Sequence, residues 1–122
     1  MNIVCVDNTP IMLQSLKESA DKAYPCANVQ AFLSAELALD YVKKFGCDVL
    51  LCEINPPRLE GLFLAEKIKQ LNPRVNIIFV TVCSESEHAK AVMRLKPSGY
   101  LTKEATSGQI LDELRNLRYP VE

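Results

Sequence analysis

The sequence predicts an α/β domain in which a five-stranded parallel sheet is covered by helices on both faces. Short apolar runs rich in β-branched residues alternate five times with stretches whose apolar residues recur at helical spacing. The 122 residues, 48% of them hydrophobic, have the size of one domain and can bury a core without disulfides or a metal. The alternation of strand and helix is typical of a parallel sheet.

Five segments are expected to form the strands. They are Asn2–Val6, Val29–Phe32, Asp48–Cys52, Asn76–Thr81 and Gly99–Leu101. Near-continuous apolar runs of this kind are typical of parallel strands that are buried on both faces. The helical stretches between them supply the crossover connections that parallel strands need.

The helix ends are marked by capping residues and prolines. Thr9 followed by Pro10 predicts an N-cap and a first-turn proline for the first helix. Two further pairs have the spacing of a capping box, namely Ser84 with Glu87 and Thr106 with Gln109. Asn72 and Pro73 end the third helix before the fourth strand.

The helices should turn their periodic apolar residues toward the sheet. The positions expected in the core are Ile11, Met12, Leu16, Ala20, Leu37, Leu39, Tyr41, Val42, Leu62, Ala65, Ile68, Leu71, Ile110, Leu111, Leu114 and Leu117. They are interpreted as packing residues and carry no predicted chemistry.

The charge balance excludes several partners for this domain. With 14 Lys+Arg against 15 Asp+Glu, the net charge of -1 gives no electrostatic basis for binding nucleic acid or an anionic membrane. No apolar run approaches the ~18 residues of a membrane span, and the opening MNIVCVD runs directly into a strand pattern without a leader. We therefore expect a cytoplasmic domain, with any DNA binding located elsewhere.

The five cysteines are expected to be reduced core thiols. They are Cys5, Cys26, Cys47, Cys52 and Cys83. They form no C-x-x-C pair, and three of them lie within apolar, strand-like runs. This spacing favours packing over a disulfide framework or a zinc site.

Polar residues follow the predicted strands at their carboxyl ends. Asp7 and Asn8 follow the first strand, Glu53 the third and Lys103 the fifth, and Thr81 ends the fourth. Because the carboxyl ends of parallel strands converge on one crevice, these side chains should meet there. Carboxylates suit Mg²⁺, and hydroxyl and ammonium groups suit phosphoryl oxygens. Polar strand ends without any function are the alternative.

Four segments together resemble the receiver domain of bacterial two-component response regulators. They are V-D-N after the first strand, C-E-I-N-P-P-R-L-E-G-L after the third, F-V-T in the fourth and G-Y-L-T-K in the fifth. The second of them matches the family's D-I-x-M-P-x-x-x-G, with Pro57 and Gly61 in step. The resemblance covers essentially the whole chain. It implies a flavodoxin-like doubly wound sheet of order 2-1-3-4-5 and a signalling module that is not an enzyme.

The resemblance implies that Asp7 and Asn8 form the acidic pocket, that Glu53 occupies the phosphoacceptor position, and that all three belong to the Mg²⁺ site. Asn8, however, is neutral where the family usually has an acid, and Glu53 is longer than aspartate by one methylene, about 1.5 Å. Metal binding should therefore be weakened or lost. In-line phosphoryl transfer depends on positioning to about an ångström, so conventional phosphorylation is not expected.

The same resemblance makes Thr81 the switch hydroxyl, Tyr100 the aromatic switch and Lys103 the phosphate-binding ammonium. Glu53 is expected to reach Lys103 directly. The pocket's two carboxylates and one lysine sum to -1, against -2 for three acids and one lysine, which favours a site that is stable without metal. The pair either mimics the active state in part or is only a structural ion pair.

The family usually dimerises, or meets an output domain, through its fourth helix, fifth strand and fifth helix. Here that face carries charges of both signs, at Lys90, Arg94, Asp112, Glu113 and Arg115, which either pair across a twofold axis or are simply solvated. His88, near the start of the fourth helix, is interpreted as an exposed polar residue. A homodimer through this face is one expected assembly.

Residues 1–118 are expected to form the receiver, and residues 119–122 to begin a linker. The ending E-L-R-N-L-R-Y-P-V is similar to receivers joined to a winged-helix-type transcriptional activator domain. The resemblance therefore implies a C-terminal DNA-binding output domain beyond this chain and a sensor histidine kinase as partner.

Two other functions remain as alternatives. One is a receiver that is still switched by phosphorylation. The other is a small α/β flavin-binding protein or enzyme, but the first turn, D-N-T-P, has no glycine and offers an acid where a phosphate would sit. The chain also has no G-x-S-x-G nucleophile elbow.

Overall fold

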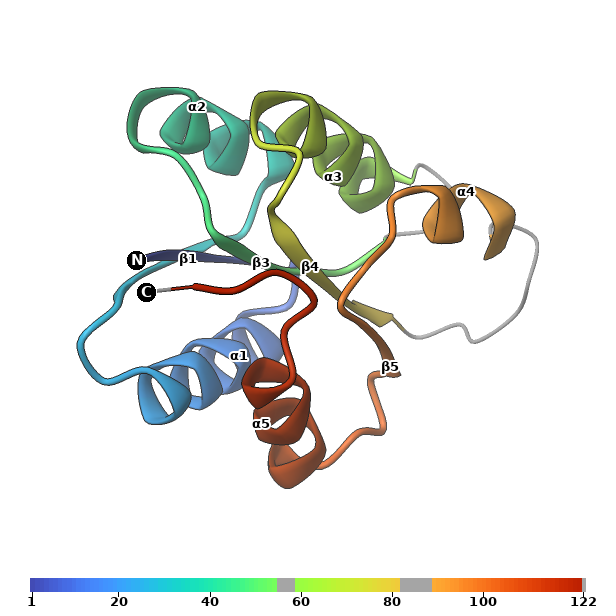
Figure 1. Ribbon diagram of the computed structural model, residues 1–122. Helices are drawn as coiled ribbons and strands as arrows, with labels where there is room; N and C mark the ends of the chain where they lie inside the picture. Colours follow the sequence, from blue (N-terminus) through green and yellow to red (C-terminus); the bar gives the residue numbers. More distant parts are fainter. Residues whose placement is uncertain (55–58, 82–88, 122) are drawn as a thin grey trace.

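The computed structural model describes residues 1–54, 59–81 and 89–121. Five parallel strands form one sheet in the order β2-β1-β3-β4-β5, as predicted (Figure 1). The strands are β1 Asn2–Val6, β2 Asn28–Phe32, β3 Val49–Cys52, β4 Asn76–Thr81 and β5 Gly99–Thr102. Since β1 lies between β2 and β3, the winding direction reverses there, and the carboxyl ends of β1 and β3 border the crevice of the fold.

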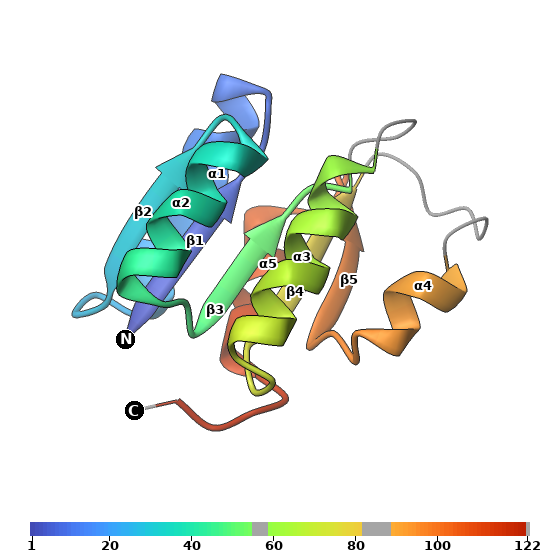
Figure 2. The same cartoon turned by 90° about the horizontal axis from the view of Figure 1, so that it is seen from above.

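Helices cover both faces of the sheet (Figures 1 and 2). They are α1 Pro10–Ala23, α2 Ala35–Phe45, α3 Glu60–Leu71, α4 Ala89–Arg94 and α5 Ser107–Arg115. Helices α1 and α5 pack on one face, and α2, α3 and α4 contribute to the core on the other. The predicted flavodoxin-like, doubly wound architecture is therefore confirmed.

Side chains alternate along each strand between the two cores. In β1, Val4 packs with α2 and α3, whereas Ile3 and Cys5 pack with α1 and α5. In β4, Phe79 and Val80 divide in the same way and are fully buried. Because both faces are covered, the strands need apolar residues at nearly every position, which explains why the sequence signal was continuous.

Most predicted helix ends agree with the structure. Thr106 and Gln109 form a reciprocal capping box at α5, and Asn72 is the C-cap of α3. Thr9 is the N-cap of α1, but its side chain makes no capping hydrogen bond. Four residues named in the sequence analysis for capping, packing or exposure fall outside the described ranges, namely Cys83, Ser84, Glu87 and His88.

Three positions predicted to face the core are instead exposed. The exposed fractions are 85% for Ile11, 58% for Leu37 and 54% for Leu71. Apolar residues lie on two sides of these helices, so the pattern indicated the helices correctly but not which side faces the sheet. In α2, for example, the buried side chains are Ala38 and Val42, which lie on the opposite side from Leu37.

The described cysteines are all free thiols. Cys5, Cys47 and Cys52 are buried, and Cys26 is exposed. Burial raises the pKa of Cys5 to about 12, so this thiol stays protonated at neutral pH. The three buried thiols agree with the expected core thiols, whereas Cys26 lies on the surface and not in the core.

The C-terminal residues return beneath the sheet and cross the amino ends of the strands (Figure 1). The side chain of Asn76, fully buried at the start of β4, pairs with the backbone of Tyr119. Its Nδ2 donates to Tyr119 O at 2.9 Å, and Tyr119 N donates to its Oδ1 at 2.7 Å. Ser98 Oγ also donates to Asn76 Oδ1 and accepts from Arg118 N. Residues 118–121 are thus part of the folded domain.

Among the described residues, no helix is long and apolar enough to cross a membrane.

Candidate functional site

The sheet brings three ionisable side chains together at the carboxyl ends of its strands. Asp7 follows β1, Glu53 follows β3 and Lys103 follows β5. The backbone ladders continue to these positions, since Asp7 N donates to Phe32 O and Glu53 N donates to Val6 O, both at 3.2 Å. The side chains of Asp7, Glu53 and Lys103 are only 0%, 7% and 15% exposed. The strand order therefore creates a compact, poorly hydrated site.

Lys103 bridges the two carboxylates. Its Nζ lies 3.1 Å from Asp7 Oδ2 and 3.3 Å from Asp7 Oδ1, and it forms an ion pair with Glu53 Oε1. A single ammonium thus compensates two buried carboxylates, which leaves the trio with one net negative charge.

The pKa of Lys103 reflects this arrangement. Desolvation by burial lowers the pKa of the ammonium, but the hydrogen bonds and charges of Glu53 and Asp7 raise it by more. The net effect is a pKa above the usual lysine value, so Lys103 is held in its charged form.

Backbone amides of the β1–α1 turn supply further donors. Thr9 N donates to Asp7 Oδ1 at 2.8 Å, and Asn8 N approaches Glu53 Oε2 at 3.5 Å. Asp7 Oδ2 accepts no hydrogen bond in the described part of the chain and relies on the charge of Lys103. Thr9 could not be predicted as a partner of the site, because its donor is a backbone amide, which no side-chain pattern shows.

The remaining predicted site residues lie at different depths. Asn8 is exposed at the rim, and Thr81 is 1% exposed at the end of β4. Thr81 adjoins the site through its backbone, because Lys103 N donates to Thr81 O at 2.8 Å. Tyr100 is 36% exposed, and its ring centroid lies 6.4 Å from that of Phe79. Tyr100 is therefore on the outer surface of β5 and not in the charged trio.

Gly61 determines how closely α3 approaches the site. A Cβ atom at this position would lie 1.5 Å from Glu53 O, which is far inside van der Waals contact. Only glycine fits there, and this requirement could not be predicted from sequence beyond the family match. The crevice lined by Asp7, Asn8, Glu53 and Gly61 has about 10 Å³ of free volume, room for about one water molecule.

The donor set fits a divalent cation poorly. Within the described ranges, no three His, Cys, Asp or Glu side chains converge as metal ligands. The two carboxylates that do converge are both paired with Lys103. A cation would have to compete with this ammonium for the same oxygens.

Comparisons with known proteins identify relatives of this architecture. The family model described as the response regulator receiver domain matches residues 3–115. Over 93% of its own length, this chain is 22% identical to the Fimbriae Z protein of Salmonella typhimurium. Over 94% of its own length, it is 23% identical to the transcriptional regulatory protein DegU of Brevibacillus brevis. It covers 54% and 49% of these proteins, about half the length of each.

Solved structures show the same fold. A CheY-like response regulator receiver domain protein from Methanospirillum hungatei superposes with a TM-score of 0.82 at 23% identity, covering 93% of this chain and 90% of that one. The family model spans nearly all of the sequence and includes Asp7, Glu53 and Lys103. This protein therefore belongs to the family of response regulator receiver domains.

Proposed function

We propose that this receiver domain signals without conventional aspartyl phosphorylation, with Glu53 in the phosphoacceptor position. The observation that supports this is the engagement of both Glu53 oxygens. Oε1 is ion-paired with Lys103, and Oε2 faces the backbone amide of Asn8. In-line attack requires a carboxylate oxygen that is positioned toward the phosphoryl group, and these two contacts restrain both oxygens of Glu53.

On the side of Glu53 that faces Asn8 and Gly61, the crevice has about 10 Å³ of free volume, room for about one water molecule. The ion pair also occupies the ammonium of Lys103, which would otherwise bind phosphoryl oxygens. In this proposal the carboxylate of Glu53 replaces the negative charge that phosphorylation would add.

We further propose that Mg²⁺ binds weakly or not at all. Asp7, Asn8 and Glu53 would be its ligands, but Asn8 carries no charge and both acids are held by Lys103. The free energy needed to break two ion pairs offsets much of the attraction between one cation and the two carboxylates.

The state of the pocket would reach a partner through Thr81 and Tyr100, on β4 and β5. We propose control by contact of a C-terminal DNA-binding output domain. The name of DegU as a transcriptional regulatory protein supports this. We also propose that the protein is cytoplasmic and that a sensor histidine kinase is its partner. A homodimer through α4, β5 and α5 is the proposed assembly.

The experiment is phosphorylation by a small-molecule donor. The native chain, Glu53→Asp and the double variant Asn8→Asp/Glu53→Asp would be incubated with Mg²⁺ and phosphoramidate and examined by intact-mass spectrometry. We expect the double variant to gain a phosphoryl group and the native chain to remain unmodified. Glu53→Gln serves as the control, since an amide cannot accept the group.

Phosphorylation of the native chain at Glu53, at a rate within about tenfold of the double variant, would contradict the proposal. It would instead support a receiver that is still switched by phosphorylation.

A further inference from the structure

Helix α2 carries an apolar stripe on the side next to the edge strand β2, with Tyr41 packed against the core and its two neighbours in the stripe exposed. Leu37, Tyr41 and Phe45 recur every four residues and so lie along one side of the helix. Leu37 is 58% and Phe45 61% exposed, whereas Ala38 and Val42 fill the side that packs on the sheet. Single exposed apolar residues are common on protein surfaces, but an aligned row of three is the pattern of a contact surface.

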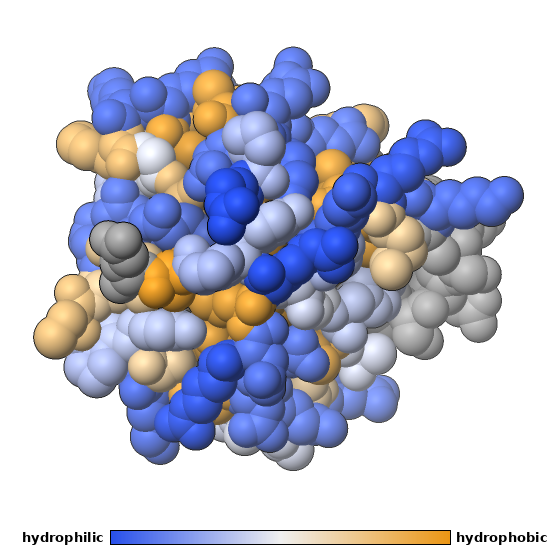
Figure 3. Space-filling model, viewed as in Figure 1, coloured by the Kyte–Doolittle hydropathy of each residue, from blue (hydrophilic) through white to orange (hydrophobic). Residues whose placement is uncertain are grey.

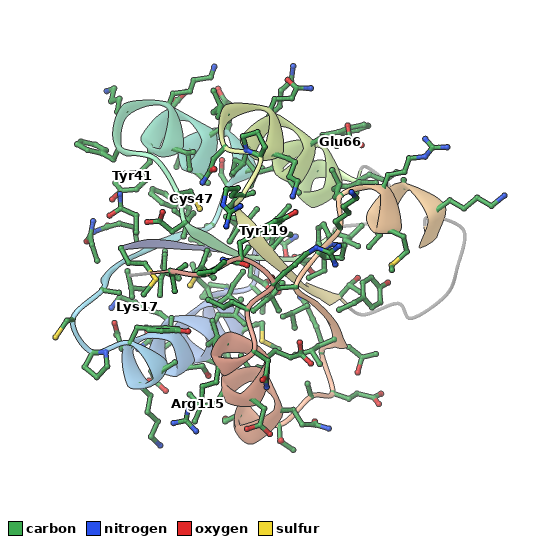
Figure 4. The ribbon with its side chains drawn as sticks, viewed as in Figure 1. Lys17, Tyr41, Cys47, Glu66, Arg115 and Tyr119 are labelled. Atoms are coloured by element: carbon green, nitrogen blue, oxygen red, sulfur yellow. The ribbon has the colours of Figure 1, made fainter. Side chains whose placement is uncertain are left out.

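The α2 stripe, defined as Leu37, Tyr41 and Phe45, extends onto the neighbouring edge strand. The ring centroids of Tyr41 and Phe45 are 4.8 Å apart, and those of Tyr41 and Phe32 are 5.4 Å apart. Leu33, directly after β2, is 51% exposed. Figure 4 labels Tyr41 beside α2 at this edge, and Figure 3 shows pale orange atoms among blue ones over the same side. The stripe is therefore continued onto β2 by the contact of Tyr41 with Phe32.

The aromatic side chains of the patch are already ordered. Asn28 Nδ2 donates to the Tyr41 hydroxyl at 2.8 Å, and the two ring contacts restrain Phe32 and Phe45. Ordered aromatic side chains lose little conformational freedom when they are covered, so they suit an interface.

The charges of α2 indicate the partner. Glu36 and Asp40 lie in the first half of the helix, and Lys43 and Lys44 in the last turn. All four are exposed, and none forms an ion pair with another described residue. The helix dipole favours acids at the start and lysines at the end, but it does not account for the apolar stripe between them.

We propose that the α2 stripe binds a second copy of this chain, with the two α2 helices antiparallel across a twofold axis near Tyr41. Leu37 then faces Phe45 of the second copy. The acidic half of each helix lies along the lysines of the other, which makes the surface complementary to itself, as an interface with twofold symmetry requires. This surface is on the β2 side of the molecule, opposite α4 (Figure 1), and the proposal is independent of the phosphoacceptor pocket.

Sedimentation velocity over a concentration series tests the interface. The native chain should associate reversibly, and Phe45→Glu should weaken the association by about tenfold or more, since it places an acid in the apolar centre. Ile11→Glu on α1 is the matched control, because Ile11 is 85% exposed and lies on neither proposed dimer face. It should leave the association unchanged. Met93→Glu on α4, where Met93 is 63% exposed, tests the other proposed dimer face. Far-ultraviolet circular dichroism checks that each variant is folded.

A charge exchange tests the antiparallel arrangement itself. One variant, Lys43→Glu/Lys44→Glu, has only acids on α2, and the other, Glu36→Lys/Asp40→Lys, has only lysines. Each should associate more weakly alone than the native chain does, and an equimolar mixture should form a heterodimer. The proposal is overturned if the native chain stays monomeric at the highest concentration reached. It is also overturned if Met93→Glu abolishes association while Phe45→Glu does not, or if the mixture stays monomeric.

Discussion

The two ends of the sheet bury polar side chains in different ways. At the carboxyl end, Asp7 and Glu53 are compensated by the ammonium of Lys103, and the crevice has about 10 Å³ of free volume. At the amino end, the neutral amide of Asn76 pairs with the backbone of Tyr119, and a hollow of about 400 Å³ lies nearby, bordered by Arg74 and Pro120. The larger hollow is thus far from the charged chemistry.

At the amino end, the buried polar side chain has a structural role. At the carboxyl end, the stability of the buried polar side chains depends on their charges. An amide with both of its groups hydrogen-bonded is stable in one arrangement. A buried ion pair, in contrast, costs desolvation and contributes little net stability, so it is poor evidence for a purely structural role.

The largest expected effect is that of Gly61→Ala, which acts on the carboxyl end through the backbone. The new Cβ would collide with Glu53 O, so α3 must shift, and we expect a loss of about 3 kcal/mol or more in the free energy of unfolding. Gly108→Ala in α5 is the control. Its Cβ would meet only Thr106 Oγ1, at 3.8 Å, and alanine favours helix, so no loss is expected. Urea titrations measure both, and equal stability of the two variants would contradict the close approach of α3.

Lys103→Met should have the next largest effect. It leaves two buried carboxylates without compensation, and we expect a loss of about 3 kcal/mol at neutral pH. Lys17→Met is the control, because Lys17 pairs with Asp21 in an exposed i,i+4 bridge that contributes about 0.3–0.5 kcal/mol.

The pH dependence sharpens the same prediction. The folded state raises the pKa of Lys103 above its ordinary value of 10.5, so the folded protein holds this proton more tightly than the unfolded chain does. The stability that Lys103 contributes is therefore fully present below about pH 10.5 and is lost as the pH rises through the raised pKa. The gap in stability between the native chain and Lys103→Met should narrow in this range, and a constant gap would argue against the ion pairs.

At the amino end, Asn76→Ala should cost about 2 kcal/mol, because it leaves the amide and carbonyl of Tyr119 without their partner. Hydrogen exchange at the Tyr119 amide should accelerate in the variant, while the amides at Asp7 and Glu53 keep their protection. Asn28→Ala, which removes an exposed side chain, is the control. Unchanged exchange at Tyr119 would show that the C-terminal residues are not held by Asn76.

The smallest effect concerns the phenol of Tyr119 (Figure 4). Its hydrogen bond from Lys69, together with the nearby charge of Arg118, lowers the pKa of Tyr119, whereas desolvation raises the pKa of Tyr24. Absorbance titration should therefore show that the phenol removed by Tyr119→Phe ionises at a lower pH than the phenol removed by Tyr24→Phe. Identical titration curves for the two variants would be inconsistent with this environment.

The sequence predicted the parts of the fold that depend on repeated patterns. Strands buried on both faces give continuous apolar runs, and polar residues after strands must meet at one edge, so Asp7, Glu53 and Lys103 could be placed together. The side of a helix that faces the sheet could not be predicted in the same way. In α2, Leu37 and Tyr41 lie one turn apart, yet Leu37 is exposed whereas Tyr41 packs against the core.

Backbone partners were also beyond prediction. The amide of Thr9 on Asp7, the contact of Gly61 with Glu53 O and the pairing of Asn76 with Tyr119 depend on the path of the chain in three dimensions. Residues 119–122 were expected to begin a linker, yet Tyr119 is anchored to the sheet. Whether an output domain follows stays a prediction.

The central claim, that Glu53 and Lys103 close this pocket to phosphoryl chemistry, is tested most directly by an amide NMR titration with Mg²⁺ and beryllofluoride. The native chain and Asn8→Asp/Glu53→Asp would be compared at Asp7, Thr81 and Lys103. We predict that only the double variant shows saturable shifts at these amides. Equal responses from the two proteins would contradict the account and show that the native pocket still accepts a phosphoryl group.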